Sequence, residues 1–204
     1  MTDSRSDSNL KIGGILLAAG GSSRLGKPKQ LTRFHGVTLL QNAAEMLAAT
    51  VCRPIVAVLG AESEAAAAEL TGIEINVSVN PDWQAGMSSS INCGLNCLLN
   101  AEPALDGVVI ALCDQPLVTA EHIGRLVQDF ALNRSPITAA SYGETLGVPA
   151  LFARSMFDEL LQLVGDKGAR RLIRDHPGLV RSVPVDEAAF DIDTADDLRR
   201  LTSS

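Results

Sequence analysis

The stretch ILLAAGGSSRLGKPKQL, residues 15–31, joins a short apolar run to a loop with three glycines, two serines and three cationic side chains. Glycine lets backbone N–H groups approach an anion closely, at an entropic cost that a plain turn does not require. Arg24 can bind phosphate oxygens as a fork, and Lys29 supplies a mobile point charge. The loop matches neither the Walker pattern nor G-x-G-x-x-G, and a flexible, solvated loop is the competing interpretation. The stretch favours a buried strand that ends in a phosphate-binding loop.

The composition is that of one soluble globular domain. Of 204 residues, 46% are hydrophobic and 20% are charged, which provides enough apolar material for a core. Residues 1–9 are polar and lack the apolar segment of a secretory signal, and no apolar run approaches the roughly 20 residues of a membrane-spanning helix. We therefore expect a single domain over residues 10–202, a flexible tail over residues 1–9, and a cytoplasmic protein with no membrane partner.

The net charge of −7 argues against a nucleic-acid partner, because so acidic a chain does not neutralise a string of phosphates. A local basic loop within an acidic protein suits one small polyphosphate instead. Without a secretory signal, the four cysteines are expected to be buried, reduced thiols: Cys52, Cys93, Cys97 and Cys113.

Short apolar runs alternate with amphipathic stretches along the chain. The expected strands are 12–18, 54–60, 73–79, 107–113 and 135–141, with 146–152 as a further strand-like run. The expected helices are 38–49, 62–71, 88–101, 120–132, 154–164 and 194–202. Continuous apolar strands separated by helices predict a mostly parallel sheet that is covered on both faces. The expected fold class is therefore α/β, a three-layer, doubly wound, Rossmann-like arrangement in which ligands bind beyond the carboxyl ends of the strands.

Polar side chains follow the third expected strand, where Asn80 leads to a helix that opens with Ser88, Ser89 and Ser90. A serine at the start of a helix is first of all an N-cap, which accounts for one of the three. The spare hydroxyls and the N-terminal amides of the helix could meet a base, a ribose or a phosphate.

A carboxylate follows the fourth expected strand. Asp114 is the first residue beyond 107–113 and lies across from the glycine-rich loop, which is where Mg²⁺ would be held. A turn that initiates a helix is the competing interpretation of this position.

Two more carboxylates lie in the run FDID, residues 190–193. We expect its apolar residues on one face of a strand, with Asp191 and Asp193 on the other. Thr194 and Asp197 fit a capping box, which explains Asp197 and leaves the other two carboxylates unexplained. Either could be the second carboxylate on the same metal.

Two further stretches suit a second substrate. The run LGVPALF is entered through a glycine and a proline, where backbone could line a pocket, and GDKGARRLI places charges around a glycine turn that leads into a helix. A solvated helix start is the competing interpretation of the latter. In the context of the other motifs, we expect these stretches to bind an acceptor and its phosphate. The candidate acceptor-binding residues are Gly147, Pro149, Asp166, Gly168 and Arg170.

A phosphate cradle, an arginine, a lysine and separate carboxylates together describe phosphoryl or nucleotidyl transfer. The stretch LAAGGSSRLGKPKQL resembles the signature loop L-A-A-G-x-S-x-R-x-G-x-x-K of nucleotidyltransferases with a GT-A-like fold. Together with NPDWQAGMSSSI, LCDQPLVT, GVPALF, GDKGARRLI and FDIDTADDL, it is similar to the branch of that family that modifies the molybdenum cofactor. The resemblance extends over about residues 10 to 202.

The resemblance implies transfer of CMP from CTP to the terminal phosphate of the molybdopterin cofactor, with release of pyrophosphate. The LAAG form implies CTP, because guanylyltransferase relatives tend to have LAGG there. The resemblance places Arg24 and Lys29 on the triphosphate, and Asp114 with Asp191 or Asp193 on Mg²⁺, with Mn²⁺ as the alternative metal. The implied nucleotide-binding residues are Leu17, Ala18, Ala19, Gly20, Gly21, Ser22, Ser23, Arg24, Lys29, Asn80, Ser88, Ser89 and Ser90.

The chain departs from many relatives at Gly147-Val148-Pro149, where they carry a histidine between the glycine and the proline. Three alternatives stay open: a sugar- or polyol-phosphate nucleotidyltransferase, a molybdenum cofactor guanylyltransferase, and a non-catalytic carrier of that cofactor. The paired carboxylates argue against the carrier. The implied partners are CTP and the cofactor, with a molybdoenzyme or its maturation chaperone as a protein partner.

Overall fold

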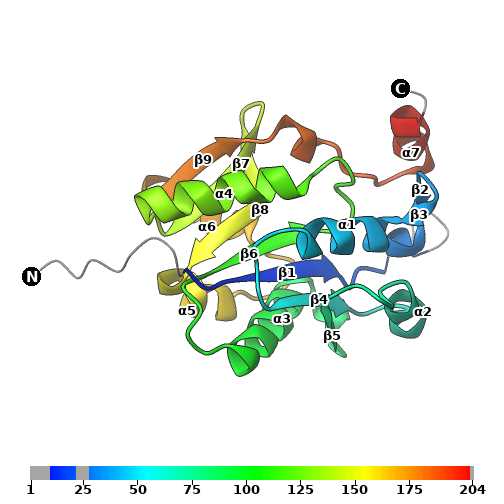
Figure 1. The fold of residues 1–204 in the computed structure, drawn as a ribbon, viewed down its shortest axis with the longest axis horizontal. Helices are drawn as coiled ribbons and strands as arrows, with labels where there is room; N and C mark the ends of the chain where they lie inside the picture. The colour runs from blue at the N-terminus through cyan, green and yellow to red at the C-terminus, as the bar shows by residue number, and fades with distance from the viewer. Residues whose placement is uncertain (1–9, 22–27, 203–204) are drawn as a thin grey trace, which may run out of the picture.

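The computed structural model describes residues 10–21 and 28–202, so the tail expected over residues 1–9 lies outside the described residues. In the described part, seven strands form one sheet in the order β5-β4-β1-β6-β8-β7-β9, and a separate hairpin pairs β2 with β3 (Figure 1). The strands are β1 (Ile12–Ala18), β2 (Arg33–Phe34), β3 (Val37–Thr38), β4 (Ile55–Leu59), β5 (Asn76–Val79), β6 (Gly107–Leu112), β7 (Ile137–Tyr142), β8 (Thr145–Ala153) and β9 (Val180–Pro184).

The strand β1 lies at the centre of the sheet. It pairs in parallel with β4 on one side and with β6 on the other, and β4 pairs in parallel with β5. Every residue of β1 is buried, as expected of an apolar run with strands on both sides and helices on both faces. β8 runs antiparallel to both β6 and β7, whereas β7 and β9 are parallel. The expected mostly parallel α/β fold is confirmed, with β8 as the antiparallel exception.

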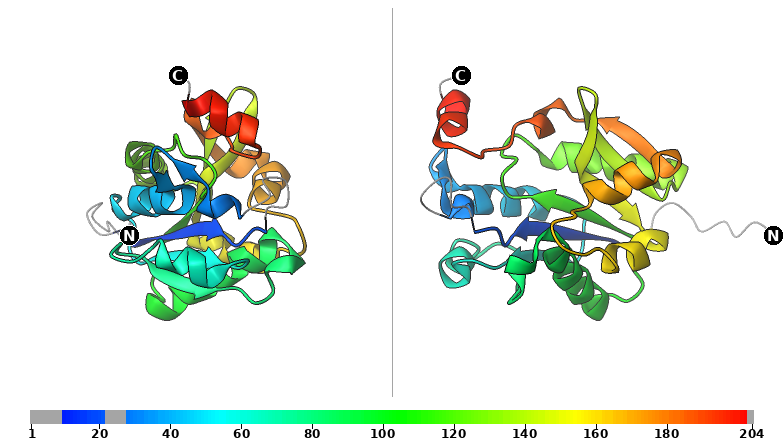
Figure 2. Two further views of the ribbon diagram at one scale, coloured as in Figure 1. Left: turned by 90° about the vertical axis from the view of Figure 1, so that its right-hand side faces the viewer. Right: turned by 180° about the vertical axis from the view of Figure 1, so that it is seen from behind.

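Helices cover both faces of the sheet (Figure 1 and Figure 2). The helices α1 (Leu39–Ala48), α2 (Ser63–Ala68) and α4 (Ala120–Asn133) pack on one face, and α3 (Met87–Ala101), α5 (Phe157–Leu161) and α6 (Arg170–Asp175) pack on the other. The last helix, α7 (Ala195–Thr202), lies beside the β2–β3 hairpin, where Leu198 packs against a cluster formed by Phe34, Leu39 and Ile192. Among the helices of residues 10–21 and 28–202, none has the length and apolar character needed to span a membrane.

Several elements are shorter than expected or were not expected. β5 is a short edge strand with mostly exposed side chains, and the helix expected over 154–164 divides into a 3₁₀ turn, η4 (Arg154–Met156), and α5. The strand β9 and the β2–β3 hairpin were not expected from the sequence. β9 buries only Val183 and carries arginine and serine, so it lacks the continuous apolar run that identified the other strands.

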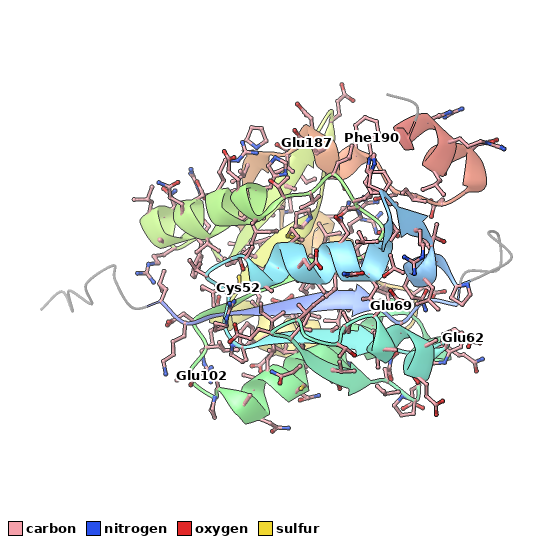
Figure 3. The ribbon with its side chains drawn as sticks, turned by 45° about the vertical axis from the view of Figure 1, so that its right-hand side comes forward. Cys52, Glu62, Glu69, Glu102, Glu187 and Phe190 are labelled. Carbon is pink, nitrogen blue, oxygen red and sulfur yellow. The ribbon has the colours of Figure 1, made fainter. Side chains whose placement is uncertain are left out.

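The strand expected at residues 190–193 is absent from the described sheet, and that prediction was wrong. The segment follows a 3₁₀ turn, η6 (Asp186–Ala189), and continues without regular structure into α7. Ile192 is fully buried and its N–H donates to the carbonyl of Asp114 (2.9 Å), whereas Phe190 is 51% exposed (Figure 3). The two apolar residues therefore share no face, because the segment passes beside the end of β6 and does not join a ladder. The capping box is confirmed: the Asp197 carboxylate accepts from the Thr194 N–H and hydroxyl, both at 2.8 Å.

Close packing of α3 on the sheet depends on Gly94. A Cβ at this buried position would lie 2.8 Å from Cγ2 of Ile15 and 2.9 Å from Cγ2 of Val58. We expect Gly94→Ala to lower the free energy of unfolding by about 1 kcal/mol, because overpacking of roughly 1–3 kcal/mol outweighs a gain of about 1 kcal/mol in helix propensity. Urea denaturation measures the change.

The matched control is Gly124→Ala in α4, where an added Cβ meets no atom within 4 Å. This substitution keeps only the helix-propensity gain and should stabilise the protein by up to about 1 kcal/mol. Equal stabilisation by the two substitutions would contradict the packing described for α3.

Candidate active site

Two adjoining clefts open at the carboxyl edge of the sheet. The first has a volume of about 600 Å³ and the second about 910 Å³, and five residues line both: Leu17, Met87, Leu112, Asp114 and Asp166. The parallel strands β1 and β6 end here with Leu17 and Leu112 near their last residues. β8 runs in the opposite direction, so its beginning, with Leu146 and Val148, lies at this edge and lines the second cleft.

The first cleft contains most of the described residues that were expected to bind nucleotide. Those that line it are Leu17, Ala18, Ala19, Gly20, Gly21, Lys29 and Ser90. Two residues that were expected to hold the metal, Asp114 and Asp193, line it as well. Ser22, Ser23 and Arg24 lie outside the described residues. The end of β1, Lys29 and two of the three expected metal-binding carboxylates are therefore brought together in one cleft.

The ammonium group of Lys29 joins two of these carboxylates. Its Nζ donates to Oδ2 of Asp114 and to Oδ1 of Asp193, each at 2.6 Å. The Lys29 side chain is only 14% exposed. Burial by itself lowers the pKa of this ammonium group, but the charges and hydrogen bonds of the two carboxylates outweigh burial and raise the pKa. Lys29 is therefore a firmly charged cation that neutralises both carboxylates.

The third expected metal ligand, Asp191, lines the second cleft together with Asp114. Oδ1 of Asp191 and Oδ1 of Asp114 are both buried without a hydrogen-bond partner among the described residues. Burial, and then the nearby negative charge of Asp114, raise the pKa of Asp191 from 3.8 to about 6. In the described part of the chain, no three His, Cys, Asp or Glu side chains are grouped closely enough to hold a metal by themselves.

The polar residues that follow β5 are used largely within the protein. The Asn80 amide donates to Oγ of Ser89 (2.8 Å) and to Oγ of Ser90 (3.1 Å), and the Ser88 hydroxyl donates to the carbonyl of Gly165 (2.7 Å). Asn80, Ser88 and Ser89 are not among the residues that line the first cleft, whereas Ser90 is. The expected serine N-cap was wrong: α3 begins at Met87, and its N-cap is Gly86, with φ 105°.

Trp83 lines the first cleft, and sequence reasoning did not assign it. A Cβ on Gly21 would lie 2.7 Å from Cη2 of Trp83, and a Cβ on Gly60 would lie 2.7 Å from Cβ of Trp83. The indole therefore needs glycine at both positions and packs on the residue where the glycine-rich loop leaves β1. Trp83 is the one tryptophan of the chain and lies in the quoted run NPDWQAGMSSSI, which was the available signal.

The second cleft combines an apolar wall with cationic side chains. Of the expected acceptor-binding residues, Asp166, Gly168 and Arg170 line it, whereas Gly147 and Pro149 do not. The stretch GDKGARRLI, which was expected to bind the phosphate of an acceptor, also brings Lys167 and Arg171 to this cleft. Arg174 lines the cleft too, and it lies beyond that stretch and was not assigned from the sequence.

Gly147 lies against the side chain of Arg170 and leaves space for its contact with Tyr142. The Arg170 guanidinium donates to the Tyr142 hydroxyl and lies over its ring, 5.8 Å from the centroid. A Cβ on Gly147 would lie 2.9 Å from Nε of Arg170, so a larger residue there would displace this pair. The glycine contributes to the second cleft through the position of Arg170.

A three-layer α/β sheet with a glycine-rich strand end, a lysine and carboxylates at its carboxyl edge has the architecture of a nucleotidyltransferase. Residues 14–180 match the family model of the MobA-like NTP transferase domain. The chain therefore belongs to the family of MobA-like NTP transferases, and its fold is the GT-A-like nucleotidyltransferase fold.

Known proteins resemble the chain over nearly its full length. Nicotine blue oxidoreductase of Paenarthrobacter nicotinovorans is 33% identical over 202 residues, which cover 93% of this chain and 96% of that protein. The crystal structure of Rv0371c from Mycobacterium tuberculosis H37Rv has a TM-score of 0.84 and 32% identity, covering 97% of this chain and 100% of that one. A structure of Rv0371c in complex with manganese has a TM-score of 0.76 and 31% identity, covering 95% and 99%.

Asp191 is expected to make stability depend on pH. Because its folded pKa of about 6 lies above the unfolded value of 3.8, the protonated form favours the folded state and ionisation destabilises it. The contribution of Asp191 to the free energy of unfolding should therefore decrease as the pH rises from about 4 through 6. Asparagine cannot ionise, so Asp191→Asn avoids this loss of stability. The free energy of unfolding of the variant minus that of the wild type should therefore be larger at pH 8 than at pH 4. Urea denaturation in the presence of a chelator measures this difference, and a difference of equal size at both pH values would contradict the assignment.

Proposed function

We propose that the protein transfers CMP from CTP to the terminal phosphate of the molybdenum cofactor and releases pyrophosphate. One observation carries the proposal: Lys29 bridges Asp114 and Asp193 in the first cleft, beside the glycine-rich end of β1. The adjoining second cleft, with its cationic side chains, suits a phosphorylated acceptor. The sequence LAAG at the end of β1 supports CTP, and the ordered set of motifs supports the cofactor as acceptor.

The residues present fit a divalent metal. Asp114 and Asp193 supply carboxylate oxygens, which Mg²⁺ and Mn²⁺ prefer, and the buried, unpartnered Oδ1 of Asp114 offers a further ligand atom. Two carboxylates suffice, because Mg²⁺ in such sites is commonly completed by substrate phosphates and water. A bound metal would neutralise charge on the triphosphate and its leaving group. The structure of Rv0371c in complex with manganese supports a divalent metal ion as a ligand of the protein.

The chain's residues would then act by orientation and charge. The first cleft would bind CTP with its triphosphate along Gly20 and Gly21, and the second would place the acceptor phosphate in line with the α-phosphorus. An oxygen of that phosphate forms the new P–O bond as the bond to the β-phosphate oxygen breaks, and pyrophosphate leaves with its electron pair. Once another cation neutralises the two carboxylates, the ammonium group of Lys29 is free to stabilise the negative charge that develops on the phosphates. No covalent intermediate is needed.

Other acceptors and bases remain alternatives within the family: a molybdenum cofactor guanylyltransferase, a sugar- or polyol-phosphate nucleotidyltransferase, or a carrier of the cofactor without catalysis. The paired carboxylates argue against a carrier, which needs no metal ligands. A redox function is a further candidate, because one relative is named nicotine blue oxidoreductase. The Lys29 bridge favours phosphate chemistry over it. We further propose a cytoplasmic protein that hands its product to a molybdoenzyme or to its maturation chaperone.

Pyrophosphate release separates these functions. The assay uses CTP, GTP, UTP or ATP, each with and without molybdopterin, and each with a sugar phosphate in its place. Release that requires CTP and molybdopterin is the expected result. Release with GTP and molybdopterin would identify a guanylyltransferase, release only with the sugar phosphate would identify the second class, and no release with any pair would contradict a transferase.

Lys29→Ala and Asp114→Asn are each expected to lower turnover roughly a hundredfold. The first removes a cation that stabilises charge on the phosphates, and the second removes a carboxylate that would hold the metal. Circular dichroism should show that both variants fold. The matched control is Lys11→Ala: Lys11 pairs with Glu102 (2.8 Å) at the opposite end of β1 (Figure 3). Normal turnover by the purified Lys29 or Asp114 variant would exclude the role assigned to that residue.

The metal and Lys29 should compete for the same carboxylates. In the absence of nucleotide, Lys29→Met removes the cation that neutralises Asp114 and Asp193, so Mn²⁺ should bind roughly tenfold more tightly to this variant than to the wild type. Calorimetric titration with Mn²⁺ measures the two affinities, and Asp114→Asn, which removes a ligand, should bind more weakly than either. An unchanged or lower affinity of the Lys29 variant would contradict the competition.

A further inference from the structure

The boundary between the two clefts is built from two distant chain segments. Met87 and Asp166 each line both clefts, Met87 at the start of α3 and Asp166 in the loop before α6. We call residues 165–168 the acceptor loop. Because both clefts share these side chains, the position of the acceptor loop against α3 sets the position of one cleft relative to the other.

The acceptor loop and the start of α3 are in direct backbone contact. A Cβ on Gly86 would lie 2.7 Å from the N atom of Asp166, so the contact requires glycine at position 86. The Gly165 carbonyl accepts two hydrogen bonds from Ser88, one from the backbone N–H (3.2 Å) and one from the hydroxyl (2.7 Å). Ser88 is 3% exposed, so water cannot readily replace its hydroxyl contact. The carbonyl of the acceptor loop thereby satisfies one of the free N–H groups at the start of α3.

The neighbouring Ser89 faces a different segment. Its hydroxyl lies within hydrogen-bond distance of the carbonyl oxygens of Asp82 (2.9 Å) and Gly86 (2.8 Å), and it accepts from the amide of Asn80 (2.8 Å). These partners belong to the 80–86 segment, which brings Trp83 to the first cleft. Two adjacent serines of one helix therefore hold the walls of two different clefts.

We propose that Ser88 is a positioning residue for the acceptor: it holds the acceptor loop against α3 and thereby fixes the position of the second cleft relative to the first. The inference rests on the proposed function in one respect, namely that the second cleft takes the acceptor. Ser88 itself does not line either cleft, so it acts through Gly165 and Asp166. Loss of its hydroxyl lets the loop occupy displaced positions, and the acceptor then binds to a smaller fraction of competent molecules.

The test compares Ser88→Ala with Ser89→Ala, which removes the same atom at the next position of the same helix. In steady-state kinetics with CTP and molybdopterin, Ser88→Ala should raise the KM for molybdopterin roughly three- to tenfold and leave the KM for CTP unchanged. Ser89→Ala should raise the KM for CTP instead. An equal effect of both variants on both KM values, or on kcat alone, would overturn the inference.

Two further measurements do not depend on the acceptor. Because Trp83 lines the first cleft, its fluorescence should report nucleotide binding there. Ser88→Ala should bind the nucleotide that the wild type binds, whether CTP, GTP, UTP or ATP, with wild-type affinity. Hydrogen–deuterium exchange should increase in Ser88→Ala over residues 165–174 and in Ser89→Ala over residues 80–86. If the wild type fails to transfer CMP to molybdopterin, the proposed function is wrong, and these two measurements still decide the inference. Unchanged exchange over 165–174, or nucleotide affinity lowered as in Ser89→Ala, would overturn it.

Discussion

The parallel pairing of β1 with β4 and β6 is the constraint on which the rest of the structure depends. Because these strands run in one direction, their carboxyl ends meet at one edge, and the residues that follow them face each other across a cleft. Lys29 and Asp114 are 85 positions apart in the chain, yet they form a hydrogen bond of 2.6 Å at this edge. β8 runs antiparallel to β6 and therefore begins at this same edge, where its first residues line the second cleft beside the first.

Opposite charges lie close together at the carboxyl edge of the sheet. The chain has a net charge of −7, and Asp114, Asp191 and Asp193 gather near the strand ends. Burial, and then the negative charge of Asp114, make ionisation of Asp191 costly. Lys29 offsets two of these charges, while Asp191 keeps a pKa raised to about 6. We propose that a divalent cation and a polyphosphate bind together at this edge, because the cation offsets the negative charge of both the carboxylates and the phosphates. The cationic side chains of the second cleft would extend this balance of charge to the phosphate of the proposed acceptor.

The parts of the site that were predictable from the sequence have strong local signals. The sequence correctly predicted the buried strand that became β1 and the position of Asp114 just after the strand that became β6, because strand direction alone decides which residues lie at the carboxyl edge of a parallel sheet. The predictions that were wrong rested on sequence patterns that are compatible with more than one structure. Alternation in FDID fits a strand, but Ile192 is instead buried in a cluster with Phe34, which lies far away in the chain. The serines fit an N-cap or a ligand site, and their partners, such as Gly165, lie in segments that no local pattern connects to them.

The sequence by itself determined the order of most strands and helices along the chain, the residue types that follow the central strands, and the broad nucleotidyltransferase family, because these depend on periodicity and on short motifs read along the chain. Only the tertiary structure decided how these residues are used. It turned Lys29 toward two carboxylates, packed Trp83 on Gly21 and Gly60, and divided Ser88 and Ser89 between two cleft walls. The physical reason is that a hydrogen bond or an ion pair forms between whichever groups packing brings within about 3 Å of one another, and packing is a property of the whole chain.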